Sequence, residues 1–100
     1  MMVASVARES NQLLLISGHI DFDNALALKQ QGEALISTGD SHCKIDFSAV
    51  THANSAALML LLNWTRHAAS LSKTIEFTCL PEDLLGVAKV SGIDQLLFLK

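Results

Sequence analysis

A single serine, Ser55, lies where a predicted strand ends and a predicted helix begins, within the stretch KIDFSAVTHANSAALMLLLNW. Three roles are open to it. As a helix N-cap, its hydroxyl would accept a hydrogen bond from a backbone N–H two or three residues on, worth about 1 kcal/mol, and Asn54 could do the same. As a phosphoacceptor, it would place a dianion at the positive end of the helix dipole. As a nucleophile, it would need a base, for which His52 is the nearest candidate.

The residues around Ser55 argue against catalysis. A nucleophile elbow has glycines beside its serine, whereas Asn54, Ala56 and Ala57 surround this one. A lone histidine in a polar loop, such as His52, is usually just solvated. Capping is therefore the default role of Ser55, and no catalytic residue is predicted.

The other candidate side chains are scattered along the chain. The remaining histidines show no spacing typical of a metal site, and neither a metal nor a cofactor is predicted: His19, His42 and His67. Cys43 and Cys79 form no CxxC motif and lie in apolar segments, so both are expected to be buried, reduced thiols. Asp46 is expected to accept backbone N–H bonds and fix a loop.

Length and charge narrow the class of protein. The chain has 100 residues, half of them apolar and 17% charged, which is typical of one globular domain spanning residues 1–100. A formal net charge of −3 and the absence of any Lys/Arg cluster disfavour nucleic acid and anionic membranes as partners. The first residues lack a basic start with a long apolar centre, and we expect a cytoplasmic protein.

Apolar spacing predicts an α/β domain. The expected order is two strands joined by a turn near residues 9–12, then a helix, a strand, a helix, a strand and a helix, with LLFL near the end as an edge strand. Because a strand, helix and strand in sequence make a right-handed crossover, the strands after the first helix should run parallel to the second strand. We therefore expect a mixed, mostly parallel sheet of about four to five strands flanked by helices. The predicted ranges are residues 3–7, 13–17, 24–38, 42–50, 55–70, 74–80 and 81–92.

The predicted helix at residues 55–70 has three stripes. One is expected to face the sheet: Leu58, Leu61, Leu62, Thr65 and Ala69. A second apolar row beside it is also assigned to the core: Leu60, Trp64, Ala68 and Leu71. The third should meet solvent or a partner, since Met and Arg are enriched in protein interfaces: Ala56, Met59, Asn63, Arg66, His67 and Ser70.

The stretch IDFSAVTHANSAALMLLL resembles the signature of STAS domains, the module shared by anti-sigma factor antagonists and the cytoplasmic tails of sulfate transporters. In that signature, an aspartate, two hydroxyl residues and a glycine stand between the strand and the helix. The run from Gly18 to Leu28 and the closing PEDLLGVAKVSGIDQL also agree with the family's order, so the resemblance covers nearly the whole chain.

Three positions depart from the signature, and the one at the second hydroxyl position bears on function. Asn54 stands at the usual aspartate, Ser55 on the first hydroxyl position, Ala56 on the second and Ala57 on the usual glycine. In anti-sigma factor antagonists the second position is the serine that a partner kinase phosphorylates, and Ala56 has no hydroxyl. The resemblance therefore does not predict this phosphoswitch, and phosphorylation of Ser55 remains an alternative.

The chain is more similar to the small MlaB-like STAS proteins of the Mla phospholipid transport system, in length, in the opening GHIDFDNALAL, and in a single hydroxyl residue followed by small ones. In that branch the domain binds the cytoplasmic ATPase of an ABC transporter. The resemblance implies a non-enzymatic subunit, peripheral to the inner membrane through its transporter, with this partner-binding set: Asn54, Ser55, Ala56, Met59, Asn63 and Arg66. The alternative is a signalling switch that binds a serine kinase or anti-sigma factor.

Overall fold

Four strands form one mixed sheet in the order β1-β2-β3-β4. In the computed structural model, which describes residues 4–53 and 55–90, the strands are β1 (Ser5–Ser10), β2 (Leu13–Ile20), β3 (His42–Ala53) and β4 (Thr74–Thr78). β1 is antiparallel to β2, whereas β3 runs parallel to both β2 and β4. The predicted α/β class and the mostly parallel sheet are confirmed, while the LLFL segment lies outside the described residues.

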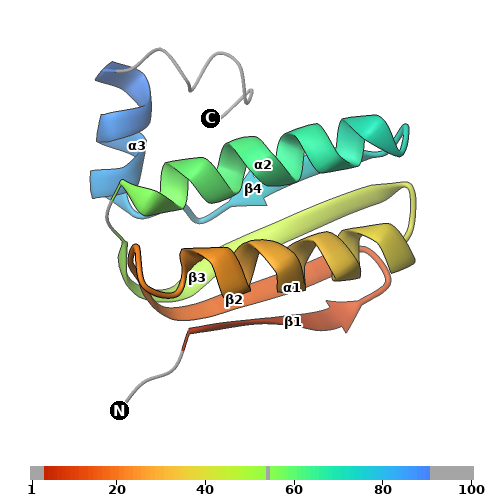
Figure 1. Cartoon of the computed structure of the whole chain (residues 1–100), viewed down its shortest axis with the longest axis horizontal. Helices are drawn as coiled ribbons and strands as arrows, with labels where there is room; N and C mark the ends of the chain where they lie inside the picture. Colours follow the sequence, from red (N-terminus) through yellow and green to blue (C-terminus); the bar gives the residue numbers. More distant parts are fainter. Residues whose placement is uncertain (1–3, 54, 91–100) are drawn as a thin grey trace.

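Two helices lie side by side on one face of the sheet, and a third lies beside the start of the second (Figure 1). They are α1 (Ala25–Thr38), α2 (Ala56–Ser70) and α3 (Glu82–Val90). Alternate residues of the central strands point under α1 and α2 and are buried, among them Leu14, Ile16, Ile45 and Phe47. The core is therefore a single layer between the sheet and the two long helices.

The predicted bounds differ from the structure mainly at strand ends. β3 continues to Ala53, three residues beyond its predicted end, with register shifts against β2 on the way. At one of these shifts the Asp46 carboxylate accepts the Ser48 N–H at 2.8 Å, as predicted, but it does so inside β3 and not in a loop, so the predicted loop at Asp46 is wrong. β4 ends at Thr78, not at residue 80, because Cys79 has a left-handed backbone (φ 57°) that cannot continue a strand.

Trp64 on α2 fills the space between the two long helices. Its side chain is fully buried, and its indole Nε1 donates a hydrogen bond to the Lys29 carbonyl of α1 at 3.1 Å. The ring lies against Gly32, where a Cβ atom would stand 2.6 Å from Trp64 Cζ2 and closer still to Cε2 and Nε1. Gly32 is thus required by packing, because any side chain there would overlap the indole.

The last turn of α1 carries no basic residue of its own, and its carbonyls are bonded by cations from elsewhere in the fold. Lys73, before β4, donates to the carbonyls of Ile36, Ser37 and Gly39 at 2.8–3.0 Å. Arg8 of β1 donates to the Leu35 carbonyl at 2.9 Å. Positive charge here complements the negative end of the helix dipole.

The predicted faces of α2 are correct along most of the helix and wrong at its ends. Leu58, Leu60, Leu61, Trp64 and Ala68 are buried as expected. Ala69, in the last turn of α2, and Leu71, just after the helix, were assigned to the core but are exposed. Ala56, assigned to solvent, is only 1% exposed, because α3 packs beside the first turn of α2, which periodicity within one helix cannot show.

Cys43 is buried as predicted, but the prediction for Cys79 was wrong, since that thiol is exposed just after β4. Burial raises the pKa of the Cys43 thiol above its ordinary value of 9.0, because desolvation disfavours the thiolate.

We predict that Gly32→Ala lowers the free energy of unfolding by about 1–3 kcal/mol, because the added methyl group must displace the Trp64 ring. Urea denaturation followed by tryptophan fluorescence measures this loss. The matched control is Gly86→Ala on α3, where a Cβ meets no atom within 4 Å. Equal stability of the two variants would contradict the packing of Trp64 on Gly32.

We predict that Ellman's reagent modifies one thiol per native chain rapidly at pH 8, and the second only in denaturant. Cys79 is exposed, whereas Cys43 is buried and its raised pKa keeps it in the unreactive thiol form. The Cys79→Ser variant should show almost no native reaction. Rapid labelling of that variant would mean that Cys43 is accessible.

Candidate functional site

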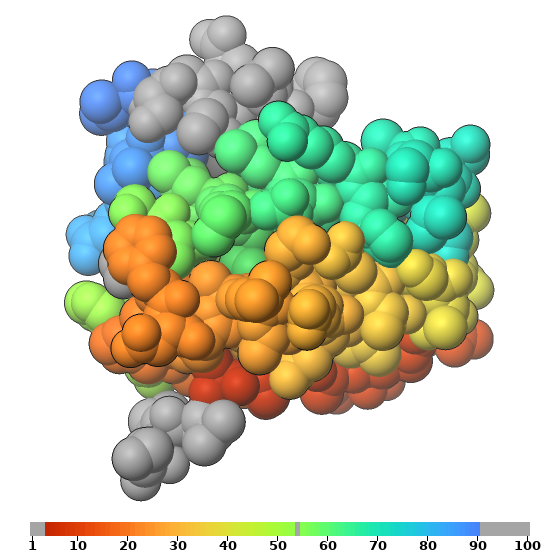
Figure 2. Space-filling model, in the orientation of Figure 1, coloured from red at the N-terminus to blue at the C-terminus, as the bar shows by residue number. Residues whose placement is uncertain are grey.

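The carboxyl ends of β2 and β3 bring two chain segments together at one end of the molecule. The parallel pairing of these strands runs to Ile20 opposite Ala53, so the chain leaves the sheet at both places side by side. One segment leads into α1 and contains Phe22, and the other leads into α2 and contains Ser55. Figure 2 shows the segment before α1, the start of α2 and α3 grouped at this end.

Ser55 occupies the predicted N-cap position of α2 and is exposed. Its backbone carbonyl accepts the Leu58 N–H at 3.1 Å, but its hydroxyl makes no capping hydrogen bond. The prediction of the position is therefore confirmed and that of the capping bond is wrong. The reason lies in the backbone of Ser55, which is already helical (φ −62°, ψ −15°), whereas a side-chain cap usually needs an extended residue.

The other predicted partner-binding residues lie in different environments. Met59 (46% exposed) and Arg66 lie on the outer face of α2. Asn63 lies between them, half-buried, and donates to the Met59 carbonyl of its own helix at 2.8 Å. Ala56 is buried and Asn54 lies outside the described residues, so Ser55, Met59 and Arg66 are the exposed members of the set in the described structure.

Two large apolar side chains that sequence reasoning missed lie at the same end of the molecule. Phe22, in the segment before α1, is 68% exposed, and Leu26, in the first turn of α1, is 63% exposed. The buried face of α1 carries Ala25, Leu28, Gly32 and Ile36, and Leu26 lies off that stripe. Two features of the sequence could have indicated that these side chains are exposed: the offset of Leu26 from the buried stripe, and the position of Phe22 between two aspartates. We call Phe22, Leu26, Ser55 and Met59 the strand-end surface.

Short hydrogen bonds hold the segment before α1 in place. The Asp21 carboxylate accepts the N–H groups of Asp23 and Asn24 at 2.9 and 3.0 Å. Asn24 in turn accepts the Asp21 N–H at 3.0 Å and donates to the His19 carbonyl at 2.7 Å. Asn24 stands at the N-cap position of α1 but makes no side-chain capping bond, and instead uses its side chain to close the loop that carries Phe22.

His52 has a structural partner and not a catalytic one. Its ring packs on that of His19 across the strand pair, with centroids 4.8 Å apart. In the described structure no hydrogen bond joins His52 to Ser55. The two residues do not form a nucleophile and base pair here.

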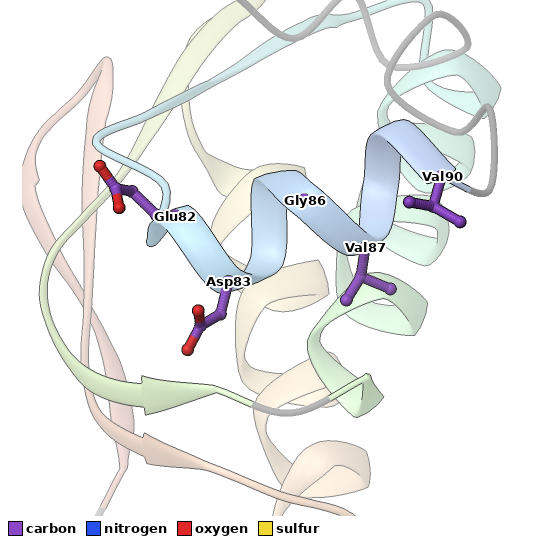
Figure 3. A pocket seen from close by; sticks show the side chains of 5 residues that line it. All are labelled: Glu82, Asp83, Gly86, Val87 and Val90. Atoms are coloured by element: carbon purple, nitrogen blue, oxygen red, sulfur yellow. The ribbon is translucent and has the colours of Figure 1, made fainter.

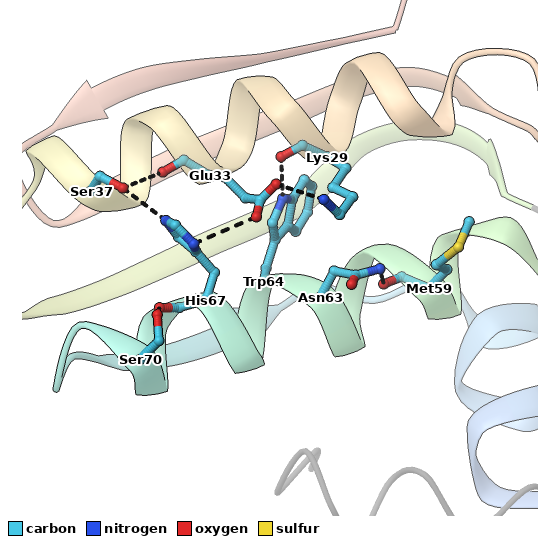
Figure 4. Close-up of polar contacts among 8 residues, drawn as sticks. All are labelled: Lys29, Glu33, Ser37, Met59, Asn63, Trp64, His67 and Ser70. Carbon is cyan, nitrogen blue, oxygen red and sulfur yellow. Dashed lines mark hydrogen bonds and ion pairs between the residues drawn. The ribbon is translucent and has the colours of Figure 1, made fainter.

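A polar network crosses between α1 and α2 (Figure 4). His67 Nε2 lies 2.7 Å from the Ser37 hydroxyl and His67 Nδ1 lies 3.5 Å from the Glu33 carboxylate, which is also paired with Lys29 at 2.9 Å. The order of Ser37, His67 and Glu33 matches a catalytic triad. However, the Ser37 hydroxyl donates to the Glu33 carbonyl at 2.8 Å, so His67 must donate to it and cannot act as its base. The network joins the two helices.

Within residues 4–53 and 55–90, no three His, Cys, Asp or Glu side chains gather as ligands for a metal ion. None of the three described helices is long and apolar enough to cross a membrane.

The strand order and the pair of helices on one face define a small two-layer α/β domain of the STAS type. Residues 4–99 match the family model described as "Mlab, STAS domain", and the chain belongs to this family. No curated protein matches the sequence.

The solved structures similar to this domain include two that match at least nine-tenths of the chain. One is a chain of the Acinetobacter MlaFEDB complex in its ATP-bound Vtrans2 conformation, 31% identical, with a TM-score of 0.78 over 90% of this chain and 95% of that one. The other is the anti-sigma factor antagonist SpoIIAA in its unphosphorylated form, 13% identical, with a TM-score of 0.70 over 98% of this chain and 99% of that one. At 13% identity the second similarity shows the fold alone.

Proposed function

We propose that this chain is a non-enzymatic subunit that binds the cytoplasmic ATPase of an ABC transporter for phospholipids, and that it makes the contact with its strand-end surface. The observation that carries the proposal is the 31% identity to a chain of the MlaFEDB complex over nearly the full length of both chains. The protein is held at the cytoplasmic side of the inner membrane by its partner, and the contact supports assembly of the transporter.

The geometry of the strand-end surface supports a protein partner. Three large apolar side chains are exposed to solvent at one end of the molecule: Phe22, Leu26 and Met59. Exposed apolar surface raises the free energy of the protein in water, and contact with a partner would bury that surface. Ser55 lies beside them with a hydroxyl that no capping bond uses, and it can give one hydrogen bond to the partner. Arg66 and Asn63 extend the contact along α2.

The alternative, an anti-sigma factor antagonist that binds a serine kinase, is less well supported. The position that carries the phosphorylated serine in those proteins is Ala56 here, which has no hydroxyl and is buried. In this chain the phosphate would have to be carried by Ser55, one position earlier. Detection of phosphoserine at Ser55 in protein from native cells would favour this alternative.

We predict that Ser55→Arg weakens binding to the cognate ATPase and permease complex at least tenfold, or about 1.4 kcal/mol, because the long cation would hold the two surfaces apart. The fold should be unchanged, since Ser55 is exposed. Arginine at the buried Ala56, in contrast, would destabilise the fold itself, so a loss of binding by that variant would not report on the interface. A pull-down from native extract, with affinities then measured on the purified complex, tests the prediction.

The control for this experiment is Ser70→Arg, the same change at an exposed serine at the other end of α2. Normal binding by both variants would remove Ser55 from the interface. If the protein lost with Ser55→Arg is a serine kinase and not an ABC ATPase, the signalling alternative is correct.

We predict that the pair Phe22→Ser and Leu26→Ser reduces ATPase binding about tenfold but changes the free energy of unfolding by no more than about 0.5 kcal/mol, since both side chains already face solvent. Biolayer interferometry and urea denaturation measure the two effects. Leu71→Ser, an exposed leucine at the far end of α2, is the matched control. Unchanged affinity of the double variant would place the contact elsewhere.

A further inference from the structure

A groove on the outer side of α3 contains Gly86, a glycine against which no described residue packs. The groove has a volume of about 430 Å³ and is lined by Glu82, Asp83, Gly86, Val87 and Val90 (Figure 3). Gly86 is in the middle of the helix and exposed, and a Cβ built on it meets no atom within 4 Å. At Gly32, by comparison, the Trp64 ring leaves no room for a side chain.

A glycine in the middle of a helix destabilises it relative to alanine, because the unfolded chain loses more freedom on folding. Among the residues that the structure describes, none packs within 4 Å of a Cβ at Gly86 to compensate for that loss. The small residue therefore leaves this part of the groove open. A partner backbone or a bulky partner side chain approaching α3 closely would need this space.

The walls of the groove indicate the chemistry of its occupant. Val87 and Val90 are 42% and 90% exposed and stand one helical turn apart, so they present an apolar strip. In Figure 3, Val87, Val90 and Asp83 project to the same side of α3. Glu82 and Asp83 add two exposed carboxylates at the start of the helix, and none of the described lining residues is a lysine or arginine. The complementary surface is apolar with positive charge at one end.

We propose that this groove binds a segment of the transporter ATPase that carries a lysine or arginine beside apolar side chains, in addition to the contact at the strand-end surface. The inference rests on the proposed function. It adds a second contact of different chemistry, in which the cation pairs with Glu82 and Asp83 and a bulky apolar side chain lies over Gly86 between Val87 and Val90. α3 lies beside the start of α2, so one partner can reach both surfaces (Figure 1).

The test is Gly86→Leu, which fills the groove without disturbing the core. We expect the melting temperature of the free protein to rise by roughly 4–8 °C, because leucine is a far better helix former than glycine. We expect affinity for the purified ATPase and permease complex to fall at least tenfold. A variant that is more stable and yet binds less tightly cannot have lost binding through unfolding. Lys89→Leu, on the same helix but outside the groove lining, is the control and should bind normally.

The charge requirement is tested separately with Glu82→Lys together with Asp83→Lys. The double variant should bind at least tenfold less tightly at low salt, and the difference from the wild-type protein should shrink as NaCl is added, since exposed charges are screened. If the double variant loses the same affinity at every salt concentration, or loses none, the proposal that a cationic segment occupies the groove is wrong.

The remaining outcomes distinguish the two proposals. If Ser55→Arg abolishes binding while Gly86→Leu binds as the wild-type protein does, the ATPase contact stands and the groove proposal is wrong. A fall in melting temperature for Gly86→Leu would mean that the chain's own residues fill the groove, and a wild-type dimer that Gly86→Leu dissociates would mean that a second copy does. Either result overturns the proposal. If the wild-type protein does not bind the complex, the proposed function itself fails.

Discussion

The contact between Trp64 and Gly32 sets the distance between α1 and α2, and the position of the surface at the helix starts depends on that distance. The indole is fully buried, is anchored by its hydrogen bond to the Lys29 carbonyl, and leaves no room for a side chain on the facing turn of α1. Further along the same helix pair, Glu33, Ser37 and His67 form a polar bridge. These contacts lie in the middle and at the far end of the helices, so the first turns are left free to present Leu26 and Met59 outward.

The ends of α1 show how a small domain satisfies its helix termini with residues from distant parts of the chain. Lys73 bonds three carbonyls at the C-terminal end of α1 and Arg8 bonds another, so the edge strand and the segment before β4 are both attached to this helix. At the N-terminal end, Asp21 and Asn24 bond each other's backbone and stabilise the loop that carries Phe22. Ordering a loop on binding lowers affinity, because the lost conformational entropy opposes association. A loop that is already held in place, as this one is, avoids that loss when the surface binds a partner.

The proposed contacts differ in chemistry, and this difference bears on specificity. The strand-end surface is apolar with a single hydroxyl, whereas the groove on α3 is apolar with two carboxylates. Apolar area contributes affinity with little directional preference, while paired charge selects among partners and speeds their encounter. An ATPase that met only one of these surfaces would bind less tightly than one that met both. Ala56, which is 1% exposed in the first turn of α2, is a packing residue and takes no direct part in either proposed contact.

The amino-acid sequence by itself determined the order of the elements and the core stripe of α2 away from its ends, because both follow from the spacing of apolar residues along one segment. It also determined the parallel pairing of β3 with β2, because a strand, helix and strand in sequence form a right-handed crossover. It also located Ser55 at the start of α2 through the change from alternating to helical spacing. The tertiary structure alone decided that Ala56 is buried and Ala69 exposed, that Cys79 faces solvent, and that Phe22, Leu26 and Met59 are all exposed. It also decided which helical glycine packing requires: a Cβ at Gly32 would overlap the Trp64 ring, whereas a Cβ at Gly86 meets no described atom within 4 Å. The physical reason is the same throughout: periodicity describes one element at a time, while burial at an element's ends depends on neighbours distant in the sequence.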